Sequence, residues 1–144
     1  MAIGVGNGYA PPAFGGDVAR LEGTFTYTQV ANATLYSREG LPLIVPRGAV
    51  FVDCWLEITT VFNAASTNTL SIGNSGDDNY FYDAAAGGTA AVLRYGDTGS
   101  VLGRMGGAPL TEDTTLTATY AQTGTAASAG AARFVLLYCI PKEQ

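Results

Sequence analysis

Few residues of this chain have side chains suited to catalysis. The sequence contains no histidine, two cysteines and twelve carboxylates. Without histidine, Ser-His-Asp and Cys-His catalysis and most catalytic zinc sites are excluded. The cysteines lack C-x-x-C spacing, and no glycine-rich pattern of a nucleotide-binding loop occurs. Carboxylates are therefore the only remaining source of enzymatic chemistry.

Asp53 and Glu57 are the two carboxylates whose spacing could suit a catalytic pair of the glycosidase type. They lie four residues apart in an alternating segment. On a strand they would share a face about 13 Å apart, at roughly 3.3 Å per residue. Glycosidases of either stereochemistry need a shorter separation. We therefore interpret both as polar positions on a strand edge, and we predict neither an enzyme nor a cofactor.

The acidic loop at residues 73–79 is the one candidate for a metal site. Its oxygens could hold Ca²⁺, but it lacks the Asp-x-Asp-x-Asp-Gly pattern of an EF-type loop. Asp and Asn are also common turn residues, because their side chains bond the nearby backbone. We expect a turn here and no metal, with calcium as the open alternative.

Aromatic and thiol side chains have two interpretations each. Tyr80, Phe81, Tyr82 and Tyr95 gather in one loop-rich region, which is compatible with a sugar-binding surface but more typical of a core or subunit interface. The two cysteines, at positions 54 and 139, each fall inside a strand pattern. We expect them to be buried free thiols that act as small hydrophobes.

The elements that position these residues are predicted to be strands. Apolar residues alternate with polar ones with period two, and helix signals are nearly absent. The expected strands are residues 23–30, 41–45, 50–62, 68–73, 80–82, 92–95, 114–122 and 131–140. We expect strand 68–73 to pair with the long strand 50–62 before it. The pattern predicts one all-β domain, a β-sandwich with jelly-roll-like connections.

The last predicted strand is apolar on both faces. Phe134, Leu136, Tyr138 and Ile140 would lie on one side, and Val135, Leu137 and Cys139 on the other. Leaving the second row in water would forgo roughly 5 kcal/mol, at about 1.5–3 kcal/mol for each large side chain. We therefore expect a loop, the N-terminal segment or another subunit to cover it, and we assign Val135, Leu137 and Cys139 to a subunit interface.

Residues 1–16 differ from the rest of the chain. They are rich in Gly and Pro, yet they carry the apolar residues Ile3, Val5, Tyr9 and Phe14. Disordered tails seldom carry spaced apolar anchors. We predict an extended arm at 1–16 that contacts a partner through these four residues, followed by the sandwich domain at 17–144; an unstructured tail is the alternative.

Charge is scarce and excludes some partners. Charged residues make up 13% of the chain, the net charge is −5, and six of the seven cations are arginine. Low charge with Arg in place of Lys is typical of surfaces that pack against proteins. The alternative interpretation, compatible with the first, is a domain whose surface is covered by neutral Thr, Ser and Gly residues. A chain without basic runs is not expected to bind nucleic acid. No stretch approaches 18 apolar residues and none resembles a signal peptide, so we expect neither a membrane span nor secretion.

Several motifs together resemble one group of proteins. They are residues 46–53 (PRGAVFVD), 69–73 (TLSIG), 77–81 (DDNYF), 116–119 (LTAT) and the final strand. This pattern is similar to that of tailed-phage capsid decoration (cement) proteins, over roughly residues 45–140. The resemblance implies a jelly-roll-like sandwich that forms a homotrimer, is assembled in the host cytoplasm and binds the major capsid protein on the outer surface of the virion. The arm would then be the capsid contact. The alternative is a glycan- or receptor-binding module of a phage fibre or tail.

Overall fold

The computed structural model describes residues 17–28 and 32–141. Within these ranges the chain forms strands and no helix. The strands are β1 (Ala19–Thr26), β2 (Ala33–Thr34), β3 (Ile44–Val45), β4 (Val50–Thr60), β5 (Thr67–Asn74), β6 (Asp77–Ala86), β7 (Val92–Arg94), β8 (Thr114–Thr123) and β9 (Ala131–Cys139). The predicted all-β class is confirmed.

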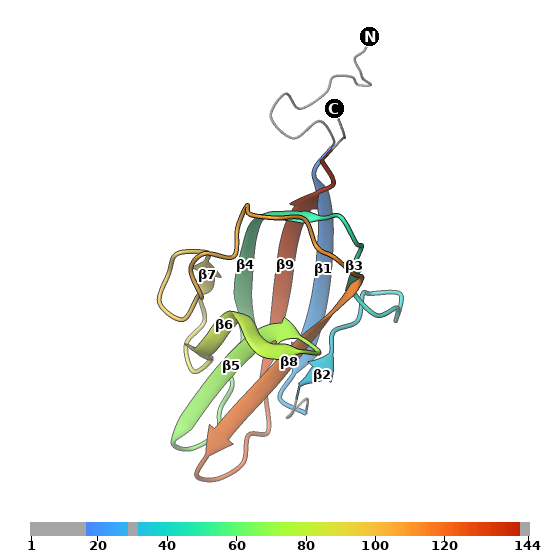
Figure 1. Ribbon diagram of the computed structural model, residues 1–144. Helices are drawn as coiled ribbons and strands as arrows, with labels where there is room; N and C mark the ends of the chain where they lie inside the picture. Colours follow the sequence, from blue (N-terminus) through green and yellow to red (C-terminus); the bar gives the residue numbers. More distant parts are fainter. Residues whose placement is uncertain (1–16, 29–31, 142–144) are drawn as a thin grey trace.

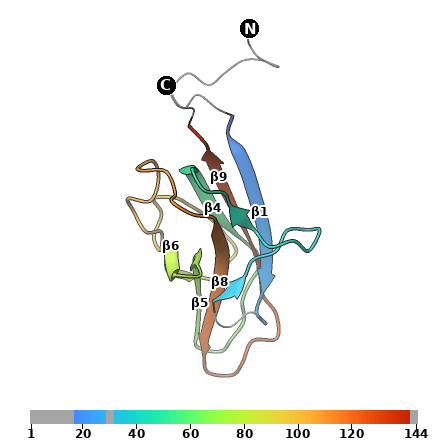
Figure 2. The same ribbon diagram turned by 45° about the vertical axis from the view of Figure 1, so that its right-hand side comes forward.

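Two antiparallel sheets pack face to face and form the predicted β-sandwich (Figures 1 and 2). The first sheet has the order β1-β9-β4-β7, so the first and last strands are neighbours. The second sheet has the order β2-β8-β5-β6, with β3 paired to β8 as well. Because the chain repeatedly crosses between the sheets, residues far apart in the sequence become strand neighbours.

The long strand β4 departs from strict alternation at its start. From Cys54 to Ile58 every second residue is buried, as period two predicts. A register shift between Phe51 and Asp53 interrupts the ladder with β9. An extra residue in one strand reverses which side chains face inward. Phe51 therefore joins the core, whereas Val52, which belongs to the predicted inward row, is only half-buried.

The expected pairing of β5 with β4 is wrong. β5 pairs with β8 on one side and with β6 on the other, whereas β4 lies between β9 and β7. A hairpin of β4 and β5 would have left their apolar rows side by side in one layer. Crossing to the second sheet instead places Leu70 and Ile72 in the core that the two sheets share.

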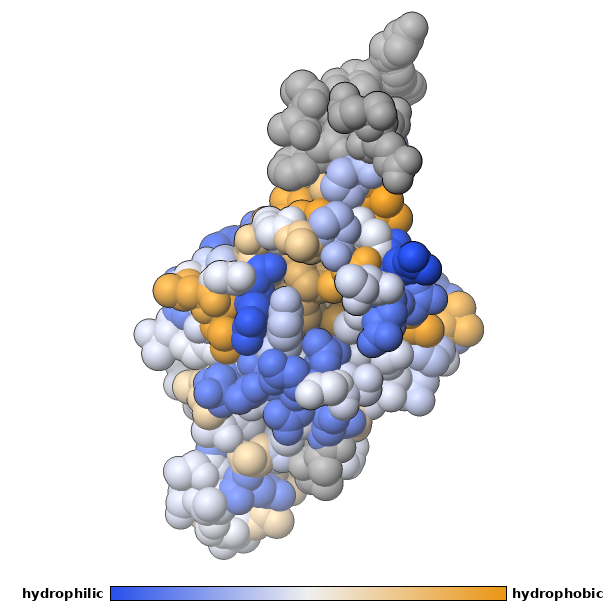
Figure 3. Space-filling view, viewed as in Figure 1, coloured by the Kyte–Doolittle hydropathy of each residue, from blue (hydrophilic) through white to orange (hydrophobic). Residues whose placement is uncertain are grey.

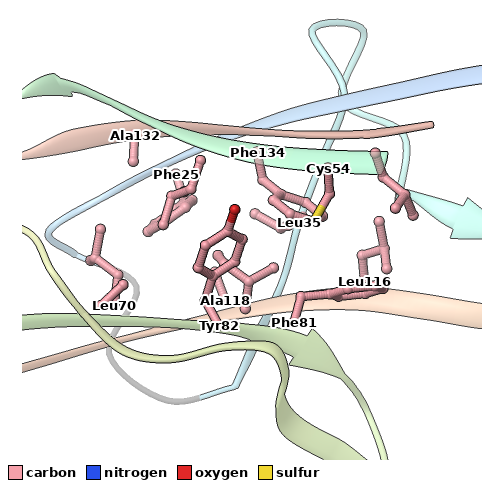
Figure 4. Packing of buried hydrophobic residues seen from close by; sticks show 14 of the residues in the cluster. Phe25, Leu35, Cys54, Leu70, Phe81, Tyr82, Leu116, Ala118, Ala132 and Phe134 are labelled. Atoms are coloured by element: carbon pink, nitrogen blue, oxygen red, sulfur yellow. The ribbon is translucent and has the colours of Figure 1, made fainter. Parts of the chain in front are cut away.

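The core lies between the two sheets, and aromatic rings connect them (Figure 4). The Phe81 ring of β6 lies 5.5 Å from the Phe134 ring of β9. Phe51 of β4 approaches Phe81 edge-on at 5.0 Å. Phe62 and Tyr120 lie 4.7 Å apart. Such pairs add to the burial of the rings, so this packing fixes the spacing of the sheets and the outward direction of the remaining side chains.

Candidate functional site: the charged face of the first sheet

The outward side of the first sheet carries the most organised group of polar side chains. We call it the charged face, and its members are Arg20, Glu22, Trp55, Glu57 and Arg133. It is built by strand register, because Val135 on β9 pairs with Glu22 on β1 and with Trp55 on β4. Two residues earlier, Arg133 pairs with Glu57. Side chains at alternate positions share a side, so these residues surround Val135.

Ion pairs cross three strands on the charged face. Arg133 lies between two carboxylates: its Nη1 donates to Glu22 Oε2 at 3.1 Å, and its Nη2 donates to Glu57 Oε1. Arg20 Nη2 donates to the other oxygen of Glu22 at 2.9 Å. The chain Arg20–Glu22–Arg133–Glu57 therefore connects β1, β9 and β4.

The same side chains seal an apolar position. The Arg20 guanidinium lies 5.5 Å from the centre of the Trp55 ring, a cation–π contact across β9. Long charged side chains cover apolar surface with their alkyl stems and keep their heads in water. Val135 lies among these stems and is 0% exposed. The second apolar row of β9 is thus covered, at Val135, by the protein's own side chains.

The electrostatics of the charged face follow from these contacts. Hydrogen bonding to Arg20, with a further contribution from Arg133, holds the pKa of the Glu22 carboxyl below its ordinary value. The hydrogen bonds of Arg133 to Glu57 and Glu22 raise the pKa of its guanidinium. Both shifts favour the ionised forms, so Glu22 and Arg133 stay charged at neutral pH.

Two hollows adjoin the charged face. The first, of about 470 Å³, lies over the sheet and is lined by Glu22, Thr24, Arg38, Glu57, Thr59 and Arg133. The second, of about 280 Å³, runs along β1 and is lined by Arg20, Leu21, Glu22, Ser37, Arg38, Glu39 and Leu43. We call the second one the edge groove. Glu22 and Arg38 line both, so the hollows meet at these two residues.

The predicted subunit-interface residues differ in exposure. Val135 is 0% exposed and Cys139 is 1% exposed, whereas Leu137 is half-buried. Only Leu137 thus keeps appreciable surface for a partner. Ile140, expected on the inner row, is 46% exposed and lies beyond the end of β9. The predicted partner contacts Ile3, Val5, Tyr9 and Phe14 lie outside the described residues.

Both cysteines are buried and free, as expected. Burial raises the pKa of the Cys54 thiol to about 12, against the opposing hydrogen bond with Tyr82. Burial also raises the pKa of the Cys139 thiol. A thiol with a raised pKa carries little of the nucleophilic thiolate, so neither cysteine has the environment of a reactive site.

The carboxylates singled out by spacing make structural contacts. Asp53 Oδ1 accepts a hydrogen bond from the backbone N–H of Cys54 at 2.8 Å, and Glu57 binds Arg133. In the acidic loop, Asn74 Oδ1 accepts bonds from the N–H groups of Gly76 and Asp77, both at 2.9 Å. These are the bonds of a tight turn. Hydrophilic side chains gather over this β5–β6 hairpin in Figure 3.

Glycine is required where that hairpin folds. A Cβ on Gly73 would lie 2.1 Å from the Asp77 carbonyl oxygen. In residues 17–28 and 32–141 no group of three or more His, Cys, Asp or Glu side chains is arranged to hold a metal ion. The loop's observed bonds are those of its turn.

The aromatic cluster does not form an open platform. Phe81 and Tyr82 are fully buried in the core. The Arg104 guanidinium lies 4.1 Å from the centre of the Tyr80 ring, and the Arg104 N–H donates to the Tyr95 hydroxyl at 3.0 Å. Sugar-binding sites need exposed ring faces, and here Arg104 occupies that of Tyr80. The core interpretation is the one that the packing supports for Phe81 and Tyr82.

Sequence reasoning did not identify the charged face. Arg133 stands alone among apolar residues of β9, which is the one signal that could have pointed to it. Its partners, however, are 111 and 76 residues away in the chain. Only strand pairing brings them together, and no local pattern reports that pairing.

Chains from three phage capsids share this fold. A chain of the cyanophage Pam1 capsid asymmetric unit matches with a TM-score of 0.66 and 22% identity, over 90% of this chain and 89% of that one. A chain of the Ralstonia phage GP4 capsid matches with a TM-score of 0.57 and 18% identity, over 94% of this chain and 91% of that one. A chain of the capsid of the Helicobacter pylori bacteriophage KHP30 matches with a TM-score of 0.55 and 18% identity, over 87% of this chain and 89% of that one.

Sequence-level comparisons gave no match, either with protein-family models or with curated proteins. No helix in the described part of the chain is long and apolar enough to cross a membrane. The likeness therefore concerns the fold, and it extends over nearly the whole length of both chains in each pair.

Proposed function

We propose that this chain is a non-enzymatic structural protein of a bacteriophage capsid. It decorates the outer surface of the virion and stabilises it by binding across neighbouring major capsid subunits as a homotrimer. The observation that carries the proposal is the end-to-end fold similarity to chains of three phage capsids. The neighbouring positions of β1 and β9 support a jelly-roll-like path of the chain.

The surface of the sandwich supports a role in packing against proteins. Large apolar side chains are exposed at scattered positions, most of all Leu102 at 70% and Leu41 at 64%. Only 13% of the residues are charged. A weak contact repeated in each subunit of an oligomer becomes strong through effective concentration. Modest surfaces of this kind are therefore sufficient for decoration.

The contact residues follow the sequence prediction as far as exposure allows. Leu137 is the one predicted interface residue that is only half-buried, so we propose it as part of a subunit contact. Residues 1–16 form the second proposed contact, which the sequence assigns to the capsid.

Binding to capsids tests the proposal. Purified protein is added to capsids that lack it, and the capsids are sedimented. We expect saturable binding, with a fixed number of copies per capsid, and a higher melting temperature of the decorated capsid. Unrelated phage capsids serve as the control. A protein that binds no capsid but binds glycans on an array would contradict the proposal and support the receptor-binding module instead.

A further inference from the structure

Among the described residues, no strand pairs with part of the outer edge of β1. β1 ends the first sheet and pairs with β9 on one side. On its other side, Thr24 forms a bridge with Tyr36, and that is the only pairing found there among the described residues. Alternate residues of 19–22 therefore present backbone donors and acceptors on this side. An exposed strand edge is a template for an added strand.

The edge groove lies beside this edge and has defined walls. One wall is the turn around Ser37, which projects beside β1 where β2 leads into β3 (Figure 2). The turn is tied to the second sheet, because Leu116 N–H donates to the Leu43 carbonyl oxygen at 2.9 Å. A Cβ on Gly23 would lie 2.5 Å from Leu43 Cδ1, so the groove closes at Gly23. The groove is therefore short and closed at one end.

The lining of the groove has two chemical characters. Its apolar lining is Leu21 and Leu43, of which Leu43 is 4% exposed. The charged lining is Arg20, Glu22, Arg38 and Glu39. Side chains of β1 alternate between the core side, with Leu21, and the charged face, with Arg20 and Glu22. A strand added here would meet apolar side chains on one side and long charged ones on the other.

The sequence outside the described residues contains a segment with the alternation that such an added strand would need. Residues 3–7 read Ile-Gly-Val-Gly-Asn. In an extended strand Ile3 and Val5 point to one side, and Gly4 and Gly6 to the other. Ile3 and Val5 would pack on the partly exposed Leu21, next to the buried Leu43, while the glycines would leave room for Arg20 and Glu22. The four edge residues span about 13 Å, which matches four or five residues of an added strand.

Proline content argues against a tight return of the chain onto its own β1. Residues 11–14, which would pair with β1 in a tight return, include Pro11 and Pro12. Proline has no N–H for a ladder and favours an extended path. Residues 8–16 span at most about 30 Å, which is enough to cross to an adjacent domain. We propose that residues 3–7 of one copy add as a strand to the β1 edge of a second copy, in the edge groove.

This inference deepens the proposed function, on whose oligomer it rests, and it assigns residues 3–7 of the arm to a neighbouring copy. Exchange of arms would hold the copies together through backbone hydrogen bonds and two apolar anchors. The sealed positions Val135 and Cys139 are then not required for the subunit contact.

Cross-linking between differently marked copies tests the exchange. One full-length variant carries Val5→Cys and another Leu21→Cys; the native thiols are both buried. We expect a covalent dimer under mild oxidation only when the two are mixed, and not when Phe14→Cys replaces Val5→Cys. A Val5→Cys/Leu21→Cys double variant that closes within one chain would overturn the inference. The absence of any link, with Ile3→Cys in place of Val5→Cys as well, would also overturn it.

A second measurement uses substitutions that lie outside the sandwich domain. We expect wild-type protein to be an oligomer by light scattering and Ile3→Lys/Val5→Lys to fall to the mass of one chain, 14.8 kDa. Its melting curve should keep the shape of a folded domain, since neither residue lies in the described core. The matched control Tyr9→Lys/Phe14→Lys should remain oligomeric.

A monomeric wild type, or an Ile3→Lys/Val5→Lys variant that stays oligomeric, would overturn the inference. Neither readout involves a capsid. An arm-exchanged oligomer that fails to bind capsids would contradict the proposed function alone. An oligomer that survives loss of Ile3 and Val5 but no longer binds capsids would return the arm to the capsid.

Discussion

The outward sides of the two sheets both face away from the core, but they carry different kinds of side chain. The first sheet presents ion pairs and an Arg–Trp contact above a buried valine. The second sheet presents, on its central strands β5 and β8, a row of short neutral side chains. We call this row the threonine face: Thr67, Thr69, Ser71, Thr115, Thr117, Thr119, Ala121 and Thr123.

Contacts on the threonine face are made by short hydroxyl side chains, with one another or with the backbone. Thr67 and Thr123 join through their hydroxyl oxygens at 2.7 Å, and Thr119 Oγ1 accepts the backbone N–H of Asn32 at 2.7 Å. On β8 the alternate residues Leu116, Ala118 and Tyr120 face the core. Each residue of this face therefore has little apolar surface to hide.

The difference follows from β9, which is apolar on both sides. An outward valine needs cover, and only long side chains from the neighbouring strands can supply it. β8 has small hydroxyl residues outward and needs no such cover. The charged face is therefore part of the fold's apolar packing, whereas the threonine face is partly or fully exposed at every member except Thr117, which is 2% exposed.

The largest expected effect comes from placing a charge beneath the charged face. Val135→Asp would bury a carboxylate at a position with no exposed surface, and we expect a loss of about 3–5 kcal/mol of unfolding free energy. The matched change Ala121→Asp, on the exposed part of the threonine face, should cost less than about 0.5 kcal/mol. Urea unfolding measures both. Equal losses would mean that the two faces are not different in burial.

Removing the cover should have an intermediate effect. Trp55→Ala deletes the ring that lies with Arg20 over β9, so Val135 gains solvent contact. We expect a loss of about 1–2 kcal/mol, below that of a fully buried aromatic residue, since Trp55 is only half-buried. Thr69→Ala is the control on the other face and should change stability by less than about 0.5 kcal/mol. Thermal and urea unfolding should agree. A Trp55→Ala variant with unchanged stability would show that Trp55 does not cover Val135.

Acid should weaken the charged face. The folded-state pKa of Glu22 is lowered by Arg20 and Arg133, so its contribution to stability is fully present above the ordinary glutamate pKa. It is lost as pH falls from about 5 through the lowered pKa. Glu22→Gln should flatten this part of the stability profile. An NMR titration should also show the Glu22 pKa rising in Arg133→Met; an unmoved pKa would exclude Arg133 as a contributor.

The smallest effect is expected from the hydroxyl pair of the threonine face. Thr123→Val removes one partner of the Thr67 contact but keeps the branched shape, and both residues are exposed. Water can replace the lost bond, so stability should change by no more than about 0.5 kcal/mol. Urea unfolding checks this. A loss near that of Trp55→Ala would show that hydroxyl pairing, too, holds its sheet together.

Period-two alternation predicted most of the strands and most of the core. Cys54, Leu56 and Ile58 are buried as expected, as are Leu70 and Ile72. These positions follow from a local rule, because neighbouring side chains of a strand point to opposite sides. The lone Gly73–Asn79 turn was predicted as well, since Asn and Asp bond their own backbone.

The arrangement of the strands was not available from local rules. The partner of β5, the bulge near Val52 and the cover over Val135 all depend on which strands lie side by side. The residue before Val135 in the outward row, Arg133, binds carboxylates 111 and 76 positions away. The sequence by itself determined which residues prefer burial, through side-chain chemistry and spacing. Only the tertiary structure decided what buries them, because the packing of two sheets against each other selects one set of neighbours from many that satisfy the same alternation.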